Sequence, residues 1–331
     1  MFVIDQYPIA VLFCIITMLA WGSWANTQKL ASPAWRFELY YWDYVFGILL
    51  FSVLLGLTAG STGAEGRPFI NDLAQAAPEH IGSALLGGIL FNAANILLVA
   101  AITLAGMSVA FPVGIGLALV IGVVVNYLDA PVGEAETLFV GVAFVALAIV
   151  LNAWAYRRLS QAREKVPAKG LILAIVAGGL MGLFYNYVAR SMFPDFTQPI
   201  PGKLSPYSAV FIFSLGILAS NLIFNTLLMR KPVEGAPVRF SDYLKGGLRN
   251  HVMGYLGGII WCLGMSFSIL ASDKAGPAIS YGLGQGATVV AALWGIYIWK
   301  EFKGAPKGVS NMLHAMLVLY VAGLALIVLA R

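Results

Sequence analysis

The chain has 331 residues, of which 60% are hydrophobic and 11% charged, and its mean hydropathy is +0.85. A soluble domain carries about 25% charged residues, so this composition excludes an ordinary water-exposed surface and indicates a membrane protein. The formal net charge is +5, and in such a protein the distribution of charge along the chain reports topology rather than a nucleic-acid partner. Cys14 and Cys262 lie in apolar runs and are expected to be small buried hydrophobes.

Ten apolar runs of about 20 residues, the length needed to cross a bilayer, follow one another along the chain. The predicted spans are 8–27, 37–58, 81–104, 107–127, 137–156, 171–189, 207–229, 252–271, 276–299 and 312–329. Two longer connections contain amphipathic stretches, 69–73 and 240–244, which we expect to lie as short helices on the membrane surface. The predicted fold class is therefore an all-α membrane protein with ten transmembrane helices.

The two halves of the chain share a pattern of small residues. Gly87-Gly88-Ile89 opens the third span and Gly257-Gly258-Ile259 opens the eighth, roughly 170 residues further on. Five spans in each half turn the second half upside down relative to the first, which is the inverted-repeat plan of secondary transporters. Further matches pair 105–106 with 275–276, 114–116 with 284–286 and, in a slightly shorter register, 22–26 with 182–186.

This repeat predicts how the chain is divided and oriented. We expect a first five-helix repeat over 1–157, a basic cytoplasmic linker over 158–170 and a second five-helix repeat over 171–331. Most of the 20 Lys and Arg residues fall in the loops that follow odd-numbered spans. Because short basic loops stay in the cytoplasm, both termini are expected outside the cytoplasm of a bacterial cell, with the spans in its cytoplasmic membrane.

Asp43 is the acidic residue that lies clearly inside an apolar span. A carboxylate buried there can titrate near neutral pH, which is the chemistry that proton coupling requires. An equally weighted interpretation is a structural carboxylate near a helix N-terminus, paired with Lys29 or Arg36.

Polar and aromatic side chains inside the other spans are the candidates for a solute pocket. Indole rings stack on flat rings or sugars, and a carboxamide offers both a donor and an acceptor to hydroxyl, amide or ureide groups. For the tryptophans the alternative is an interfacial anchor, and for Asn221 and Asn225 we favour a hydrogen bond to a neighbouring helix. The expected substrate-binding residues are Trp24, Asn26, Thr27, Asn92, Asn95, Tyr185, Asn186, Trp261 and Gln285.

Catalytic chemistry is not indicated by the sequence. The three His residues have no metal-binding neighbour at helical spacing, and the Ser, Cys and carboxylate residues form no nucleophile constellation. A phosphate-cradling loop ending in Lys-Ser or Lys-Thr is also absent from the sequence. We therefore expect neither an enzyme nor a cofactor.

The chain resembles the drug/metabolite transporter superfamily, and within it the branch of the ureide permeases, the glucose/ribose porters and the rhamnose–proton symporter. The residues that carry the resemblance are Trp21-Gly22-Ser23-Trp24 with Thr27, Tyr41-Trp42-Asp43-Tyr44, Gly87-Gly88 with Asn92, and Gly122 through Asn126-Tyr127-Leu128-Asp129. The resemblance implies uptake of a small neutral polar solute driven by protons, with Asp43 as the coupling residue. Unlike the plant ureide permeases, this chain has a short central loop.

The predicted function is a secondary active transporter that imports a sugar, ureide or nucleobase-like solute by alternating access, with protons as the coupling ion. A metabolite or drug exporter of the same fold is one alternative. A membrane receptor or assembly protein without a transport cycle is another. The expected partners are the solute, the proton and membrane lipid.

Overall fold

The computed structural model describes residues 1–160, 167–306 and 308–331. Within these ranges it contains ten helical segments long and apolar enough to cross a membrane, each overlapping one predicted span, which confirms the fold class. The helices are α1 (Tyr7–Ser23), α2 (Asn26–Leu30), α3 (Phe37–Leu57), α4 (Phe69–Gln75), α5 (Pro78–Ala105), α6 (Met107–Asp129), α7 (Ala135–Ser160), α8 (Ala168–Ser191), α9 (Pro206–Arg230), α10 (Phe240–Leu244), α11 (Leu248–Ala275), α12 (Pro277–Gly284), α13 (Ala287–Leu293), the π-helix η1 (Trp294–Ile298) and α14 (Val309–Leu329).

The first and ninth spans are interrupted, where the sequence predicted continuous helices. The first consists of α1 and α2, with a turn at Trp24 and Ala25 between them. The ninth consists of α12, α13 and η1, with a turn at Gln285 and Gly286. In transporters, interrupted helices free backbone groups where the chain borders a cavity. Both turns border the cavity described below.

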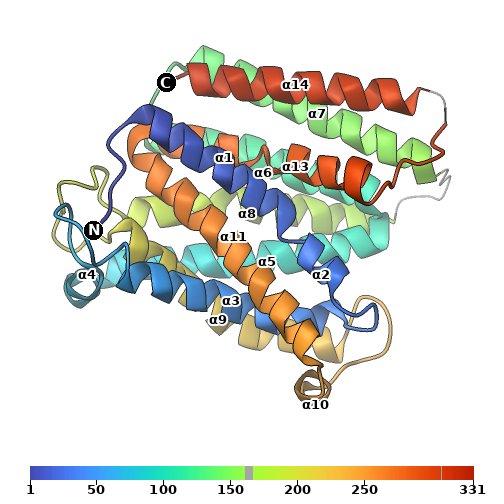
Figure 1. The fold of residues 1–331 in the computed structure, drawn as a ribbon, viewed down its shortest axis with the longest axis horizontal. Helices are drawn as coiled ribbons and strands as arrows, with labels where there is room; N and C mark the ends of the chain where they lie inside the picture. The colour runs from blue at the N-terminus through green and yellow to red at the C-terminus, as the bar shows by residue number, and fades with distance from the viewer. Residues whose placement is uncertain (161–166, 307) are drawn as a thin grey trace.

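The spans form three layers in Figure 1. The helices α7 and α14 pair along one edge, α3 and α9 lie along the opposite edge, and the remaining spans lie between them. Both termini lie at the same end of the bundle, as an even number of spans requires. The two amphipathic stretches are helical as predicted: α4 lies at the end with the termini and α10 at the other end.

Glycines at matching positions of the two halves allow close helix packing. A Cβ at Gly88 of α5 would overlap the backbone carbonyl of Phe213 in α9. A Cβ at Gly258 of α11 would likewise overlap the carbonyl of Tyr44 in α3. Such close backbone approach is what small residues provide in membrane bundles. The contact of α5 with α9 thus has its equivalent in the contact of α11 with α3.

The junctions between consecutive spans repeat this equivalence. Gly106 joins α5 to α6 with φ of 77°, and Gly276 joins α11 to α12 with φ of 81°. Positive φ is readily adopted by glycine alone among common residues. The register inferred from the sequence therefore corresponds to matching backbone conformations in the structure.

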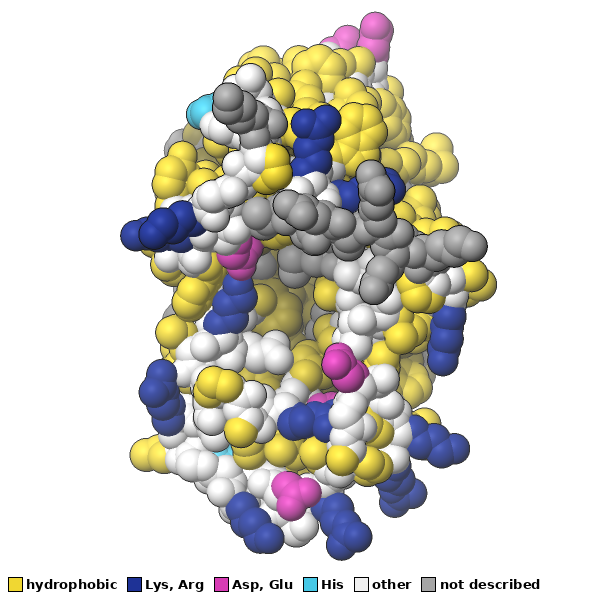
Figure 2. Space-filling view, turned by 90° about the vertical axis from the view of Figure 1, so that its right-hand side faces the viewer, with side chains coloured by type: hydrophobic (Ala, Val, Ile, Leu, Met, Phe, Trp, Pro, Cys, Tyr) yellow, Lys and Arg dark blue, Asp and Glu magenta, His cyan; other side chains and the backbone are white. Residues whose placement is uncertain are grey.

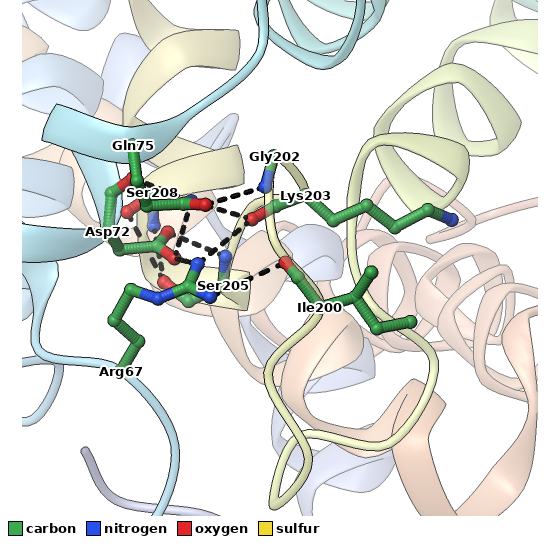
Figure 3. Close-up of polar contacts among 8 residues, drawn as sticks. All are labelled: Arg67, Asp72, Gln75, Ile200, Gly202, Lys203, Ser205 and Ser208. Carbon is green, nitrogen blue, oxygen red and sulfur yellow. Dashed lines mark hydrogen bonds and ion pairs between the residues drawn. The ribbon is translucent and has the colours of Figure 1, made fainter.

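A polar network at the end that carries the termini ties the α3–α5 connection to the α8–α9 connection (Figure 3). The buried carboxylate of Asp72 accepts hydrogen bonds from Arg67 at 2.9 Å and from the backbone N–H of Ser205 at 2.7 Å. Gln75 donates to the carbonyl of Lys203 at 3.0 Å and accepts from the N–H of Gly202 at 2.6 Å. Because a buried carboxylate without partners is costly, this network holds the two connections together.

Candidate substrate-binding site

A cavity of about 270 Å³ lies within the bundle, between spans of both halves. Its walls come from α1, α2, α5, α6, α7, α8, α11, α13 and η1. It extends from Trp21 and Trp261, in the middle of their spans, to Tyr156 and Glu301 at the end away from the termini. Figure 2 shows that face, where Lys and Arg side chains surround a hollow with hydrophobic side chains at its floor.

Aromatic rings form the inner wall of the cavity. Trp21 and Trp261 stack with ring centroids 5.9 Å apart and planes 15° apart. The ring centroid of Phe91 lies 4.2 Å from that of Trp261, and the ring centroid of Phe184 lies 5.3 Å from that of Phe91. Trp24 packs on Tyr44 at 4.7 Å. These rings offer a flat apolar surface to a bound solute.

Carboxamides supply the polar groups of the cavity. Asn95, Asn152 and Gln285 all line it, and Asn26 lies near its mouth. The Oδ1 atom of Asn152 is buried and has no hydrogen-bond partner in the described part of the chain. A buried acceptor without a partner costs stability, and among the described side chains with such an atom Asn152 is the one that lines the cavity.

An ion pair closes one side of the cavity mouth. Lys29 Nζ lies 2.8 Å from Glu301 Oε1, and the hydroxyl of Tyr156 donates to Glu301 Oε2 at 2.7 Å. Burial raises the pKa of Glu301, but the two hydrogen bonds and the charge of Lys29 outweigh it and hold the pKa below its ordinary value. Lys300 has φ of 53°, a strained conformation for a residue with a side chain. The strained residue thus lies between Trp299 and Glu301, which both line the cavity.

The structure brings five of the nine predicted substrate-binding residues to this cavity: Trp24, Asn26, Asn95, Trp261 and Gln285. The other four, Thr27, Asn92, Tyr185 and Asn186, are buried against other side chains. Trp24 lines the cavity and packs on Tyr44. Of the two asparagines expected to bond a neighbouring helix, Asn225 donates to the carbonyl of Glu38 at 2.9 Å, whereas the side chain of Asn221 has no hydrogen-bond partner among the described residues, so the expectation is wrong for Asn221.

Two tyrosines of α3 explain why Thr27 and Asn92 do not reach the cavity. The hydroxyl of Tyr40 lies 2.7 Å from Thr27 Oγ1. The hydroxyl of Tyr41 donates to Asn92 Oδ1 and accepts from Asn95 Nδ2, both at 3.0 Å. These side chains therefore connect α3 with α2 and α5, and through Asn95 with the cavity.

Asp43, on the same turn of α3, lies outside the cavity lining and is fully buried. It accepts a hydrogen bond from Tyr243 of α10 at 2.6 Å, and its carboxylate oxygens lie 2.9 and 3.0 Å from His251 Nδ1 of α11. The pairing considered from the sequence, with Lys29 or Arg36, is wrong. Lys29 pairs with Glu301 and Arg36 with Glu38, two residues along the chain.

Several cavity residues were missed by the sequence interpretation. Phe91 and Phe184 resemble any other aromatic residue in an apolar span, so nothing in the sequence separates them from the core. Asn152 and Tyr156 carry polar groups near the end of the fifth span. Their position inside an apolar span could have marked them as candidates. Glu301 lies just beyond the ninth span, and its contact with Lys29 joins residues that are distant in the chain.

The space on the other side of Trp21 and Trp261 is sealed. The hydroxyl of Tyr185 lies 3.0 Å from Ser268 Oγ and 3.3 Å from Ser280 Oγ. Ser268 and Ser280 lie 3.1 Å apart, and all three side chains are fully buried. Asn186 and Arg190 meet Asp129 at the ends of α8 and α6 that lie on the side of the termini, with distances of 3.2 and 2.8 Å.

Within the described residues, a bundle of ten helical segments long and apolar enough to span a membrane contains a polar and aromatic cavity that is open at one end, which is the architecture of a multi-pass solute carrier. The chain matches the ureide permease family over residues 40–168 and 154–330, and it belongs to this family.

Several proteins that are similar to this chain over most of its length are named as permeases or uptake proteins. Ureide permeases 1 and 2 of Arabidopsis thaliana are each 23% identical, over 99% of this chain and 98% of theirs. The glucose uptake protein GlcU of Bacillus subtilis (strain 168) is 25% identical over 67% of this chain and 69% of its own. A protein of known crystal structure, 17% identical, shares the fold with a TM-score of 0.62 over 98% of both chains. The chain is thus a transporter of small polar solutes and not an enzyme.

Proposed function

We propose that this protein imports a small neutral polar solute, such as a ureide, nucleobase or sugar, by proton-coupled alternating access. The observation that carries the proposal is the chemistry of the cavity, where stacked indoles face the carboxamides of Asn95, Asn152 and Gln285. The charged side chains among its described lining residues, Lys29 and Glu301, pair with each other at the mouth. A pocket whose charges are already compensated favours an uncharged solute.

The direction of opening follows from the charge of the two faces. The cavity opens on the face that carries the basic loops after odd-numbered spans, which we assign to the cytoplasm of a bacterial cell. Both termini then lie outside, and this conformation is open inward. Arg163 and Lys165, in the basic linker 158–170, lie outside the described residues.

The halves that move are the two repeats proposed from the sequence, 1–157 and 171–331. Supporting this division, the Gly88 contact with α9 and the Gly258 contact with α3 are equivalent in the two repeats. Residues 161–166 of the proposed linker, 158–170, lie outside the described ranges. In this mechanism the solute binds near Trp21 and Trp261, and rocking of the repeats exposes it to each side in turn.

Proton coupling is assigned to Asp43, with His251 as its exchange partner. Asp43 is fully buried, whereas the side chain of His251 is 23% exposed near the basic face. His251 can therefore pass a proton between Asp43 and the cytoplasm. Tyr41, two residues from Asp43, bonds to Asn95 in the cavity wall, which gives a physical route from carboxylate to solute.

Transport by purified protein in liposomes tests this function. A panel of allantoin, uracil and glucose is offered with the lumen more alkaline than the outside, and uptake is compared with liposomes that have no pH gradient. The proposal predicts that at least one solute accumulates only with the gradient. Equal uptake with and without it, for every solute taken up, would contradict the coupling.

The exporter alternative uses the same cavity in the opposite direction. Right-side-out and inside-out membrane vesicles separate the two. Import predicts that an outside-acidic gradient drives accumulation in right-side-out vesicles, whereas a proton-exchanging exporter would accumulate the solute in inside-out vesicles instead.

A further inference from the structure

The seal on the outer side of the cavity consists of hydroxyl groups where apolar packing would suffice. Tyr185, Ser268 and Ser280 come from α8, α11 and α12, and each is fully buried. Besides the contacts among themselves, Ser280 donates to the carbonyl of Ser268 at 2.6 Å, and Cys14 of α1 lies 3.7 Å from Ser280 Oγ. A permanently closed core does not require such groups, because replacing both partners of a buried hydrogen bond by apolar groups can be nearly neutral or stabilising.

The repeat register places this seal opposite the walls of the open cavity. Leu98 of α5 lines the cavity, and the residue at the matching position of α11 is Ser268. Phe111 of α6 lines it as well, and its match in α12 is Tyr281, which adjoins Ser280 and whose ring centroid lies 5.2 Å from that of Tyr185. The register is the one in which Gly88 matches Gly258, so it rests on equivalent helix contacts as well as on sequence.

The shorter register, which matches the first span to the sixth, also pairs cavity-lining residues with residues on the sealed side. Ala25 and Asn26 line the open cavity, and their matches in α8 are Tyr185 and Asn186. Asn26 accepts a hydrogen bond from Trp299 at the open mouth, at 2.6 Å. Asn186 donates to Asp129 at the closed outer end, at 3.2 Å. Side chains that match the lining of the open cavity thus converge on the sealed side.

We infer that the hydroxyl cluster of Tyr185, Ser268 and Ser280 is an outer substrate subsite, closed in this conformation and exposed to the outside when the repeats rock. The inference rests on the proposed alternating-access function. It adds the residues that would meet the solute when the carrier is open to the outside. Each hydroxyl donates and accepts, so the ligand is an uncharged solute with both donors and acceptors, such as a ureide or a sugar. When the outer side opens, water or the solute takes over the hydrogen bonds that the three residues now make to one another.

Thiol labelling tests the exposure of this cluster. In a background with Cys14→Ser and Cys262→Ala, the Ser268→Cys variant is treated in right-side-out vesicles with a membrane-impermeant methanethiosulfonate. The matched control is Ser214→Cys, because Ser214 is also fully buried and lies at a similar depth from the outer end of α9, bonded to Ser52 at 2.9 Å. The inference predicts labelling of Ser268→Cys at least ten times faster than of Ser214→Cys. Equal rates in variants that still transport would overturn it.

A second pair of measurements separates this inference from the function on which it rests. Tyr185→Phe should raise the KM for entry of whichever of allantoin, uracil and glucose is taken up by roughly fivefold. Tyr207→Phe is the control and should leave the KM unchanged, because the hydroxyl of Tyr207 donates to the carbonyl of Phe2 and not to the cluster. If Asn152→Cys is labelled from the basic side and uptake persists while Ser268→Cys stays unlabelled, the outer subsite is wrong and the carrier function stands. If none of the solutes is transported by the unmodified protein, the function itself is wrong.

Discussion

Asn95 donates a 3.0 Å hydrogen bond to the hydroxyl of Tyr41, so a side chain of the cavity wall is bonded to the helix turn that carries Asp43. The same hydroxyl donates to Asn92. On either side of Tyr41, Tyr40 contacts Thr27 and Tyr44 packs on Trp24. A displacement of α3 therefore cannot leave the cavity wall unchanged.

Removal of the Tyr41 hydroxyl should loosen this connection. Tyr41→Phe leaves the ring packing intact but leaves Asn92 and Asn95 without a shared partner, at a cost of about 1–3 kcal/mol for buried amide groups. We expect a KM for solute uptake raised roughly fivefold to tenfold. Kinetics in proteoliposomes measure it, with Tyr7→Phe as control, because Tyr7 bonds the carbonyl of Val328 far from the cavity. An unchanged KM in the Tyr41→Phe variant would show that Asn95 does not depend on Tyr41.

Replacement of Asp43 should separate binding from coupling. Asp43→Asn keeps the size of the side chain and an acceptor for Tyr243, so the protein should still fold and exchange solute down a gradient. Accumulation against a gradient should be lost, because the carboxamide binds no proton. His251→Gln should slow accumulation without abolishing counterflow. Undiminished proton-driven accumulation by Asp43→Asn would remove Asp43 from the mechanism.

The indoles of the cavity should contribute much of the solute affinity. Trp24→Ala and, separately, Trp261→Ala remove ring surface that stacks on the solute, and we expect binding to weaken by about 1–3 kcal/mol, roughly 5-fold to 150-fold. Trp154→Ala is the matched control, because Trp154 on α7 is 56% exposed and does not line the cavity. Equilibrium binding of the transported solute to detergent-solubilised protein measures the difference. Equal affinity in Trp24→Ala and Trp154→Ala would place the site elsewhere.

The ion pair at the mouth predicts a small pH effect. Burial raises the pKa of Glu301, but the hydrogen bonds from Lys29 and Tyr156 and the charge of Lys29 outweigh it and hold the pKa below its ordinary value of 4.5. The ionised form is thus favoured by folding, so its stabilisation is present above pH 4.5 and is lost as the pH falls through the lowered pKa. Both side chains are partly exposed, which limits the effect to about 1 kcal/mol.

Thermal unfolding of the wild type and of Glu301→Gln measures that effect. The difference between them should be seen near neutral pH and vanish at about pH 3. Glu79→Gln serves as the control, because the side chain of Glu79 is 78% exposed. A difference that persists undiminished at about pH 3 would mean that Glu301 acts through something other than its charge.

The spans could be predicted because hydropathy is a local property. Each run of apolar residues must hydrogen-bond its own backbone in lipid, so length and composition sufficed for all ten helices within the described residues. The interruptions at Trp24 and Gln285 could not be predicted in the same way. They depend on contacts with the cavity, and the sequence around them contains no proline.

The site was only partly predictable, for a physical reason. Trp24, Asn95 and Gln285 could be identified because polar or aromatic groups in a span need partners or water. Thr27 and Asn92 meet the same criterion but are satisfied by tyrosine hydroxyls, which only the packing of α3 reveals. His251 starts a span and could not be assigned to Asp43 without knowing that α11 packs on α3.

The most direct measurement of the central claim is proton-driven uptake of allantoin, uracil and glucose by proteoliposomes, with the wild type and Gln285→Ala compared side by side. Gln285 lines the cavity at the turn between α12 and α13. The account predicts that a solute accumulates under an inward proton gradient in the wild type, and that its KM rises at least fivefold in Gln285→Ala. Accumulation with the same KM in both proteins would contradict a substrate site in this cavity.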